Sequence, residues 1–432
     1  MSNPPRRSIE PRERARHRIV VLTGNHLCHN PRVIKEADAL AAAGYEVEVL
    51  GAWIDESLAQ RDRELMARRG WKFTVVADTC RGSVARRFRR ATGSLEGRWR
   101  RRAYLRRGRL HPHLLGRAAI ALAHAALKRD ASLFIAHSEQ ALWVAQQLLE
   151  QGKCVGVDME DWFSEDLLPE ARRTRPVAWL AELERELLAR GTYRICTSAV
   201  MSDALAGAYA VAPPDVVYNV FPWADRAAID GLTKDRRDRA RVSIHWFSQT
   251  LGRGRGLGDL LRTLPLLKEP VEVHLRGTPA SDWESTFHEA CDPAFRPWVT
   301  VHPLVSNEEL LSRIAEHDVG FAGEETYCRS RELTVTNKLF QYLLGGLAIA
   351  ASNTLGQCEI AADAGEAVQI YASGDVQALA GVVNRWIDDR SSLARARQAA
   401  LTIAQQRYSW EREAPQVVSA ADQAIFARAT TC

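Results

Sequence analysis

Two polar turns in the C-terminal half of the chain combine residue types that bind phosphate or sugar hydroxyls. Asn337 and Lys338 open an apolar helical stretch, and Gly356 and Gln357 lie in a Ser-Asn-Thr-Leu-Gly-Gln turn after the buried segment 347–352. A helix N-terminus offers unpaired N–H groups and partial positive charge. A lysine in the first turn opposes that dipole, and a nearby diphosphate would offset the cost. The pattern therefore predicts a site for a diphosphate or for sugar hydroxyls.

A glycine-rich loop with two arginines follows the apolar segment 241–247. Arg253 and Arg255 alternate with glycines in the run LGRGRGLG, just before another helical stretch. Glycines let the backbone approach a ligand closely, and two guanidinium groups beside a helix N-terminus can clamp a diphosphate. The alternative is a flexible turn with solvated arginines, and the loop alone does not choose between the two.

Acidic side chains accompany these turns. Glu324 and Glu325 follow the apolar segment 318–323, and Glu359 lies in the helical turn after Gln357. A carboxylate at such a place accepts hydrogen bonds from sugar hydroxyls. The alternatives are a solvated acidic loop for the first pair and an ordinary capping charge for Glu359.

In the N-terminal half, polar residues follow two apolar segments. His137 comes after 132–136, and Asp158 and Glu160 close and follow 153–158. The carboxyl ends of parallel strands face the ligand crevice in α/β sheets. A histidine there can position an acceptor hydroxyl or take its proton. A purely structural histidine is the alternative.

Alternating strand and helix patterns must position all of these residues. The first apolar strand leads into an open loop with Gly24 and Asn25, and the next helix has Asn30 at its N-cap and Pro31 at its first position. Strand patterns occur at 18–23, 46–52, 72–77, 132–136, 153–158, 193–197 and 215–218, and again at 241–247, 271–277, 298–303, 318–323, 347–352 and 367–371. This alternation is typical of doubly wound parallel sheets.

We therefore expect two α/β domains, in line with the ~200 residues of an ordinary domain. The expected organisation is a disordered basic arm at 1–17, a first domain at 18–222, a linker at 223–240, a second domain at 241–390 and C-terminal helices at 391–432 that pack back toward the first domain.

Composition narrows the class of protein. The chain has 432 residues, 46% of them hydrophobic and 26% charged, and no apolar run of the ~20 residues that a membrane span requires. The N-terminus is basic without an apolar core, so we expect no secretory signal and a cytoplasmic protein. Eight cysteines show no Cys-x-x-Cys pair. This favours reduced, buried thiols over disulfides or a zinc site.

The net charge of +5 hides one strongly basic block. Residues 81–117 contain thirteen arginines and one glutamate, a net +12, so the rest of the chain carries −7. Apolar side chains such as Trp99, Leu105 and Leu110 interleave the arginines, as in an interfacial amphipathic helix. We interpret the block as an insertion in the first domain that docks on an anionic membrane surface. A solvated basic face or a nucleic-acid patch is the alternative, and no recognised nucleic-acid motif is present.

The chain resembles the GT-B glycosyltransferases of retaining family 4 from NPRVIKEADALAAAGYEVEVL through YSWEREA. The run NKLFQYLLGGLAIAAS is similar to the family pattern "nKlfEYlaaGlPviasd", with Gln341 where the family most often has glutamate. SNTLGQCEI and the later GD resemble "GG.pEiv" and "gD". In the first domain, His137 and Asp158 match the family's "AHD" and "yDsHEl" segments, with Glu160 in place of a common histidine.

The resemblance implies two Rossmann-like domains facing across a cleft, with the C-terminal helix returning to the first. It implies transfer of a sugar from a nucleoside-diphosphate sugar to an acceptor hydroxyl, with retention and without a metal or other cofactor. Expected donor-binding residues are Arg253, Arg255, Glu324, Glu325, Asn337, Lys338, Gln341, Gly356, Gln357 and Glu359. His137 and Glu160 are the expected catalytic residues, and Gly24, Asn25 and Asp158 lie on the acceptor side. The acceptor would be a saccharide or a lipid-linked saccharide, at the inner face of the cytoplasmic membrane.

Two other functions stay open at this point. One is a two-domain nucleotide-sugar epimerase, and the other is a non-catalytic scaffold in polysaccharide assembly. Gln341, the single Gly24 after the first strand and Glu160 keep the scaffold alternative open. Asp158-x-Glu160 also resembles the Asp-x-Asp metal motif of the other large glycosyltransferase fold, which would bind Mn²⁺ or Mg²⁺ through oxygen. That fold would leave the second α/β half unexplained.

Overall fold

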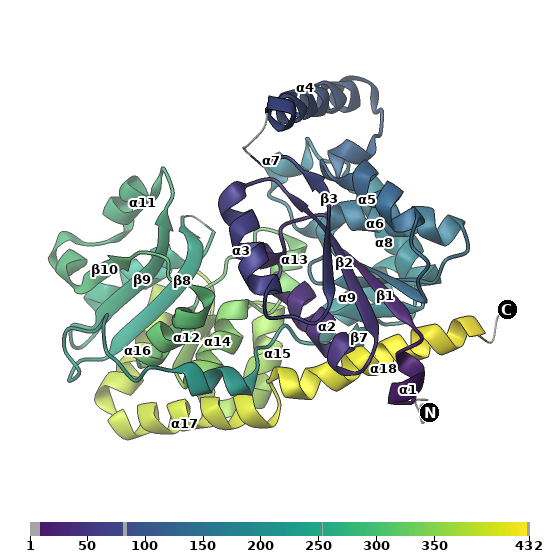
Figure 1. Ribbon diagram of the computed structural model, residues 1–432. Coiled ribbons are helices and arrows are strands. Elements are labelled where there is room, and N and C mark those ends of the chain that lie inside the picture. The colour runs from purple at the N-terminus through teal and green to yellow at the C-terminus, as the bar shows by residue number, and fades with distance from the viewer. Residues whose placement is uncertain (1–8, 81–83, 253, 430–432) are drawn as a thin grey trace. The chain divides into compact units, whose positions relative to one another are not determined.

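The structure is a computed structural model that describes residues 9–80, 84–252 and 254–429, with only the helix path given over 84–95 (Figure 1). It divides into two compact units. The first unit contains Met1–Thr197, Ser202–Val217 and Ala414–Cys432, and the second contains Ser198–Met201 and Tyr218–Glu413. No helix in the described ranges is both long and apolar enough to cross a membrane.

The first unit is built on a parallel sheet of seven strands in the order β3-β2-β1-β4-β5-β6-β7. The strands are β1 (Arg18–Leu22), β2 (Glu46–Trp53), β3 (Lys72–Asp78), β4 (Leu133–Ala136), β5 (Val155–Met159), β6 (Tyr193–Cys196) and β7 (Asp215–Val216). β1 pairs in parallel with both β2 and β4, so the strand order reverses between β1 and β4. Such a reversal marks the crevice in which open α/β sheets hold their ligands.

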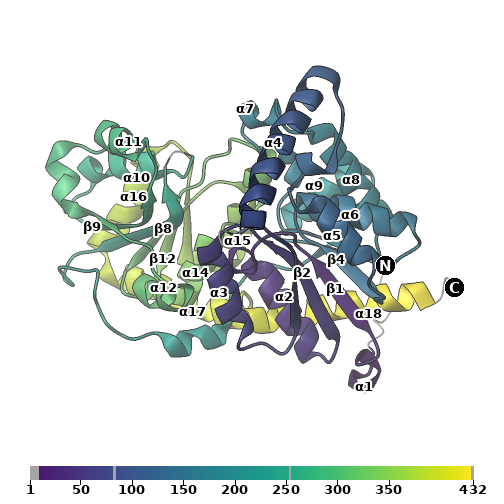
Figure 2. The ribbon, with the colours of Figure 1, turned by 45° about the horizontal axis from the view of Figure 1, so that its top comes forward.

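Helices flank this sheet. They are α1 (Pro11–Arg14), α2 (Pro31–Ala42), α3 (Glu56–Met66), α4 (Val84–Arg107), α5 (Ala119–Leu127), α6 (Glu139–Glu150), α7 (Pro169–Arg172), α8 (Val177–Arg190), α9 (Ala199–Tyr209) and α18 (Trp410–Ala429). The α2 start follows the predicted chemistry, because the Asn30 side chain accepts the Val33 N–H at 3.1 Å and Pro31 is the first helical residue. The basic insertion forms α4, a long helix close to α7 (Figure 2).

The N-terminal arm is only partly as expected. Residues 9–17 were predicted to be disordered with the rest of the arm, but they form α1 and a connection held by the last helix. The Arg14 guanidinium lies 2.7 Å from the Asp422 carboxylate of α18, and the Ile9 N–H donates to the same carboxylate at 3.1 Å. The arm is ordered there because a buried acid from the far end of the chain binds it. Residues 1–8 of the predicted disordered arm lie outside the described ranges.

The second unit has a parallel sheet of six strands in the order β10-β9-β8-β11-β12-β13. The strands are β8 (Ser243–Leu251), β9 (Glu272–Pro279), β10 (Val299–His302), β11 (Val319–Ala322), β12 (Ala348–Ser352) and β13 (Val368–Tyr371). Apolar side chains of both its faces are buried, as in β11 and β12, which is the usual state of an all-parallel sheet. Here the strand order reverses between β8 and β11.

The helices of the second unit are α10 (Leu257–Thr263), α11 (Trp283–Ala290), α12 (Asn307–Ala315), α13 (Arg329–Leu333), α14 (Asn337–Gly345), α15 (Leu355–Ala364), α16 (Val376–Asp388) and α17 (Arg390–Gln406). Gly346 ends α14 in the left-handed conformation, at φ 75°, where glycine carries no Cβ penalty. Of the helices predicted at 391–432 to pack toward the first domain, α17 lies in the second unit, and α18 belongs to the first unit from Ala414 onward.

Candidate functional site

Three loops of the second unit meet at the carboxyl ends of β8, β11 and β12, which are neighbours in the sheet. The loop after β8 contains Arg255, the loop after β11 contains Glu324, and α14 brings in Lys338. These residues lie beside the point where the strand order reverses. The fold therefore brings together three residues from separate segments that were predicted to bind a donor.

The centre of this cluster is a buried ion pair between Lys338 and Glu324. The Lys338 ammonium lies 2.5 Å from the Glu324 carboxylate, and both residues are 4% exposed. The ammonium also lies 5.6 Å from the centroid of the Trp246 ring, within the range of a cation–π contact. A buried charge of this kind is stable only when it is paired.

The surroundings of the pair are rich in positive charge. Burial lowers the pKa of Lys338, and although Glu324 opposes this, the guanidinium groups of Arg255 and Arg331 add to the lowering. Burial alone would raise the pKa of Glu324, but Lys338, with Arg255 and Arg331, more than offsets it, and the pKa lies below its ordinary value. Three cationic side chains therefore act on this one buried carboxylate. An anion placed here would be stabilised.

Ser352 and Gln357 fix the loop after β12 to the loop after β11. The Glu324 N–H donates to the Ser352 hydroxyl at 2.8 Å, and the Gln357 amide donates to the Ser352 carbonyl at 2.9 Å. Gln357 is fully buried, and its side-chain oxygen has no hydrogen-bond partner within the described part of the chain. The side-chain oxygen of Gln341 is likewise buried and unpaired among described residues. Both amides keep acceptor capacity beside the ion pair.

Two glycines allow these loops to approach closely. A Cβ added at Gly256 would lie 2.9 Å from the backbone of Gly323, so the main chains of the loops after β8 and β11 lie in close contact at this point. A Cβ at Gly356 would lie 2.6 Å from the Leu333 carbonyl. Gly356, predicted as a donor contact, thus faces the end of α13 in this structure, and its small size seats α15 against that helix.

The other predicted donor residues occupy varied positions. Asn337 is exposed at the first residue of α14, and Glu325 is exposed and accepts the Gly256 N–H at 3.4 Å. Glu359 accepts the N–H groups of Ala199 at 3.0 Å and Val200 at 2.9 Å. Its carboxylate therefore caps the start of α9, whereas the alternative predicted a capping charge in the first turn of its own helix. Arg253 lies outside the described residues.

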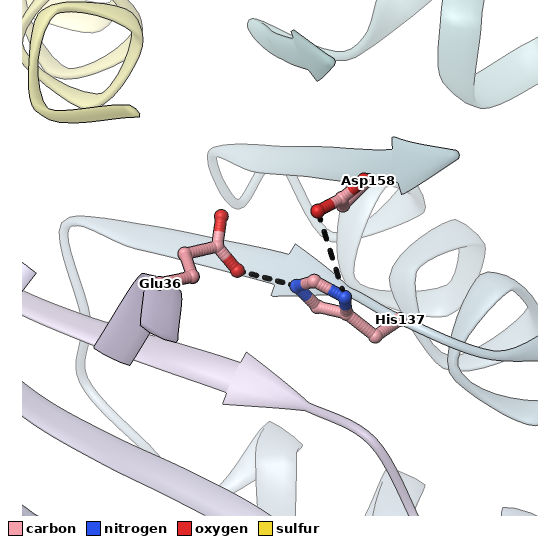
Figure 3. Close-up of side chains that lie close together, drawn as sticks. All are labelled: Glu36, His137 and Asp158. Carbon is pink, nitrogen blue, oxygen red and sulfur yellow. Dashed lines mark hydrogen bonds and ion pairs between the residues drawn. The ribbon is translucent and has the colours of Figure 1, made fainter. Parts of the chain in front are cut away.

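In the first unit, His137 lies in a buried cluster at the ends of β4 and β5. Figure 3 shows Glu36 of α2 and Asp158 of β5 on either side of the His137 ring. One ring nitrogen contacts the Glu36 carboxylate directly, and the other lies 3.8 Å from Asp158. Arg32 binds the Asp158 carboxylate, and the Tyr193 hydroxyl donates to Glu36. His137, predicted to face an acceptor, is fully buried in this structure.

The protonation of His137 follows from its neighbours. Burial alone would lower the pKa of the ring, but the carboxylates of Glu36 and Asp158 outweigh burial and raise it to about 9. Burial raises the pKa of Asp158 and of Glu160 above their ordinary values. At neutral pH the ring therefore carries its proton and acts as a cation, so it is a poor general base.

One group of side chains in the described residues has a spacing that suits a metal ion. It consists of Glu36, His137 and Asp158. The chemistry of the set does not fit this use. A metal requires an unprotonated imidazole, whereas this ring carries a proton between two carboxylates. Arg32 already neutralises Asp158. The group is better described as a charge-balanced network than as a metal site.

The remaining acceptor-side residues lie around the same strand ends. Gly24 has φ 64°, and the Gln140 amide donates to its carbonyl at 2.8 Å and to the Asn25 side chain at 3.1 Å. Asn30 donates to the half-buried Glu160 at 3.1 Å. Ser138, directly after His137, has φ 89°, a strained conformation for a residue with a side chain.

Several residues of these clusters were not predicted. Trp246, Ser352 and Arg331 belong to the donor-side cluster, and Arg32 and Glu36 to the other. Ser352 had a usable signal, because it is a polar residue at the end of a buried strand. Arg32 and Glu36 had none, because their partners come from strands more than 100 residues away.

Solved structures resemble the chain over almost its full length. The Anabaena protein HepE, solved in complex with UDP and glucose, has a TM-score of 0.67 and 16% identity, over 94% of this chain and 99% of that one. Sucrose-phosphate synthase from Thermosynechococcus elongatus has a TM-score of 0.68 and 15% identity, over 95% and 100%. A glycosyltransferase from Rickettsia africae has a TM-score of 0.64 and 10% identity, over 95% and 98%. No protein-family model and no curated protein sequence matches the chain.

Proposed function

Because the chain has the GT-B fold of these glycosyltransferase structures, we propose that it transfers a sugar from a nucleoside-diphosphate sugar to an acceptor hydroxyl. HepE has also been solved with UDP-glucose, which supports a nucleotide sugar as the donor. The transfer retains the anomeric configuration and uses no metal. The acceptor is a saccharide or a lipid-linked saccharide.

The observation that carries the proposal is the buried Lys338–Glu324 pair in its cation-rich setting. A nucleoside diphosphate that reaches Lys338 adds the negative charge that this setting lacks. Arg255 and Arg331 also attract the diphosphate, since both already act on the Lys338–Glu324 pair electrostatically. Fixed cations aimed at the departing diphosphate stabilise the transition state as oxyanion-type groups do. The same charges take the place of a metal ion.

The sugar and ribose contacts follow from the amides and acids around the pair. Gln341 takes the place of the family's glutamate, which accepts hydrogen bonds from both ribose hydroxyls. Its amide accepts a hydrogen bond from one hydroxyl and donates one to the other. Glu324, or the exposed Glu325, contacts the donor sugar, and Gln357 offers its unpaired oxygen. Gly356 contributes by seating α15.

The experiment that tests donor use is turnover of a nucleotide-sugar panel. Purified protein is incubated with UDP-, GDP- and ADP-sugars, and slow hydrolysis of the sugar is followed by release of the nucleoside diphosphate. We expect one donor to be hydrolysed and Lys338→Met to abolish the release. Tight binding of a donor without any hydrolysis or transfer would favour the non-catalytic scaffold, and binding of none would contradict the proposal.

On the acceptor side, His137 acts by position. Its charged ring, together with Glu160, fixes the strand ends that hold Gly24, Asn25 and Asp158. His137→Gln should lower kcat while donor affinity stays nearly unchanged. Equal turnover of this variant and the unaltered protein would leave His137 a structural residue.

We also propose that α4 docks on an anionic membrane surface at its cytoplasmic face. In the described half of this helix and the loop after it, Trp99, Leu105 and Leu110 are 58%, 51% and 51% exposed. Exposed arginines lie among them, at 98, 101, 102, 106, 107 and 109. Exposed aromatic and aliphatic side chains beside arginines suit the lipid interface, where each arginine near an anionic leaflet contributes about 1 kcal/mol. A lipid-linked acceptor would then be near the first unit.

Vesicle co-sedimentation tests the docking. The protein should pellet with vesicles that contain phosphatidylserine at low salt, and less at 0.5 M salt, because screening weakens exposed charges. Replacing Trp99 and Leu105 by serine should reduce pelleting further. Equal pelleting with neutral and anionic vesicles, or none with either, would contradict membrane docking.

A further inference from the structure

The first turn of α9 is capped by Ser198, which directly precedes the helix, and by a side chain from another segment of the second unit. The Ser198 hydroxyl accepts the Met201 N–H at 3.1 Å, as an N-cap residue does. The Glu359 carboxylate accepts the N–H groups of Ala199 and Val200. The N–H groups of the first three helical residues, which have no partner inside a helix, are thereby all satisfied. The negative charge also lies at the favourable end of the helix dipole.

The same carboxylate binds a second segment. The Tyr218 hydroxyl donates to Glu359 at 2.5 Å, and the Tyr218 N–H donates to the Glu413 carboxylate at 2.9 Å. The Tyr218 ring makes edge contacts with Phe340 of α14, at 6.1 Å between centroids, and with Tyr408 at 5.3 Å. Tyr218 is therefore held at its backbone, its ring and its hydroxyl.

Three of these contacts reach elements of the proposed donor site. Glu359 is on α15, two residues after Gln357, and Phe340 is on α14, two residues after Lys338. The Ser198 hydroxyl donates to the Leu333 carbonyl of α13 at 2.7 Å. That carbonyl is the one against which Gly356 is packed. The end of α13, the first turns of α14 and α15 and the capped turn of α9 thus form one cluster of hydrogen bonds and ring contacts.

The cluster coincides with the places where the chain changes units. The chain leaves one unit for the other after Thr197, Met201, Val217 and Glu413. The residues on the second-unit side of these crossings are the capped turn itself, Tyr218 and Glu413. One glutamate therefore joins donor-side helices to two of the connecting segments.

We infer that Glu359 is a positioning residue that ties the donor-side helices to these connecting segments, so that a nucleoside diphosphate bound beside Lys338 also orders the start of α9. The inference rests on the proposed donor site. It assigns the carboxylate a role different from contact with a sugar hydroxyl, because its hydrogen bonds are already made to Ala199, Val200 and Tyr218.

Amide hydrogen exchange tests the coupling directly. The full chain is labelled with and without UDP, or with GDP or ADP if one of these is the nucleoside diphosphate that binds. Binding should slow exchange at Ala199 and Val200 by about 5-fold or more, the lower end of ordinary coupling between sites. In Glu359→Gln the same amides should exchange faster and respond little to the ligand. A purely structural cap would give no ligand response in the unaltered protein, and that result would overturn the inference.

Glu411 provides a matched control. Its carboxylate accepts the N–H groups of Trp223 at 2.9 Å and Ala224 at 3.1 Å, where the 3-10 helix Trp223–Ala228 begins. It therefore caps a helix start in the same way, but neither of these two hydrogen bonds reaches α13, α14 or α15. Glu411→Gln should lower the melting temperature to a similar extent and leave nucleotide affinity unchanged.

The affinity measurement separates the outcomes. Glu359→Gln should weaken nucleoside diphosphate binding by about 3- to 10-fold, the range of mutations that alter coupling without touching the ligand. Tyr218→Phe, which removes one hydrogen bond and keeps the ring, should give a smaller loss in the same direction if the first variant is unstable. Equal affinity in the Glu359 and Glu411 variants would refute the coupling alone. Absence of binding by the unaltered protein would instead refute the proposed donor site.

Discussion

The two units each bury an ionic cluster at the point where strand order reverses, yet the balance of charge differs. Around Lys338 and Glu324, three cationic side chains meet two carboxylates when Arg255, Arg331 and the exposed Glu325 are counted, a net +1.

The cluster of the first unit has the opposite balance. Two cations, Arg32 and His137, meet three carboxyl groups, those of Glu36, Asp158 and Glu160. A cluster with unmatched positive charge is suited to an anionic ligand, whereas one with surplus carboxyl groups around a buried core is suited to fixing strand ends. Similar residue types at equivalent places in a fold therefore serve different ends.

The largest expected effect is on folding, from breaking the cluster in the first unit. Arg32→Met leaves Asp158 buried without its partner, and should lower the free energy of unfolding by about 3–5 kcal/mol. Chemical denaturation measures it. Arg18→Met is the control, since Arg18 and Glu46 form an exposed pair at 2.5 Å whose loss should cost no more than about 1 kcal/mol. Similar small losses in both variants would mean that the buried cluster is not a structural element.

The next effect is on nucleotide binding, from breaking the cluster in the second unit. Lys338→Met or Arg255→Ala should weaken nucleoside diphosphate binding by about 1.5–3 kcal/mol, the scale of a charge-assisted hydrogen bond. Arg253→Ala carries the same expectation. Isothermal calorimetry is the measurement, with Arg262→Ala as control, because Arg262 is exposed on α10 and paired with Asp259 at 3.0 Å. Unchanged affinity in the Lys338, Arg255 and Arg253 variants would rule out this site.

A smaller expected effect is a difference between the two units in how their stability depends on pH. The pKa of His137 is raised from 6.5 to about 9, so its stabilisation is complete below pH 6.5 and is lost as pH rises through 9. Burial lowers the pKa of His317 in the second unit to about 3, so its contribution is present above pH 6.5 and is lost as pH falls toward 3.

Histidine NMR measures both titrations, with the signals assigned from His137→Gln and His317→Gln. The neutral His317 ring stacks on His245 at 4.7 Å between centroids and lies tilted against His274 at 4.6 Å. The Asp235 carboxylate, 3.9 Å away, opposes the shift without reversing it. Titration of both rings near 6.5 would contradict the assigned environments.

The smallest expected effect is that of a chelator. EDTA should leave glycosyl transfer unchanged, because in the proposed mechanism Arg255, Lys338 and Arg331 supply the positive charge that stabilises the leaving diphosphate. Activity lost on chelation and restored by Mn²⁺ would show that the carboxyl groups of Asp158 and Glu160, or of Glu36, bind a metal after all.

The sheet could be predicted closely because its signal is local. Segments such as 18–23 and 347–352 are short apolar runs between turn residues, and each becomes a strand within a few residues of the expected bounds. The GT-B fold that the resemblance implied is confirmed by the solved structures. Lys338 was identified as chemically unusual from its place in a helix start, and its buried partner explains how that place is tolerated.

The ionic cluster of the first unit could not be predicted, because tertiary contacts decide which residues pair in it. Arg32 and Glu36 lie on α2, and a sequence pattern places charged residues of such a helix toward solvent. In the structure both are buried, since their partners come from β4, β5 and β6. Glu359 shows the same limit. Its position in the first turn of its own helix agreed equally well with a ligand contact and with a capping charge there, and neither predicts that it accepts the N–H groups of Ala199 and Val200 in α9.

The contact between Asp422 and α1 has a consequence for biosynthesis. Asp422 accepts hydrogen bonds from the Ile9 N–H, the Arg14 side chain and the Tyr45 hydroxyl, and Ile9 lies 413 residues earlier in the chain. A ribosome makes the whole second unit between these partners. The first unit, although its sheet emerges first, therefore receives its last support only after its neighbour has been synthesised. Until Asp422 has been synthesised, Arg14 and Tyr45 lack this partner. Chaperones and proteases can bind the incomplete first unit during that time.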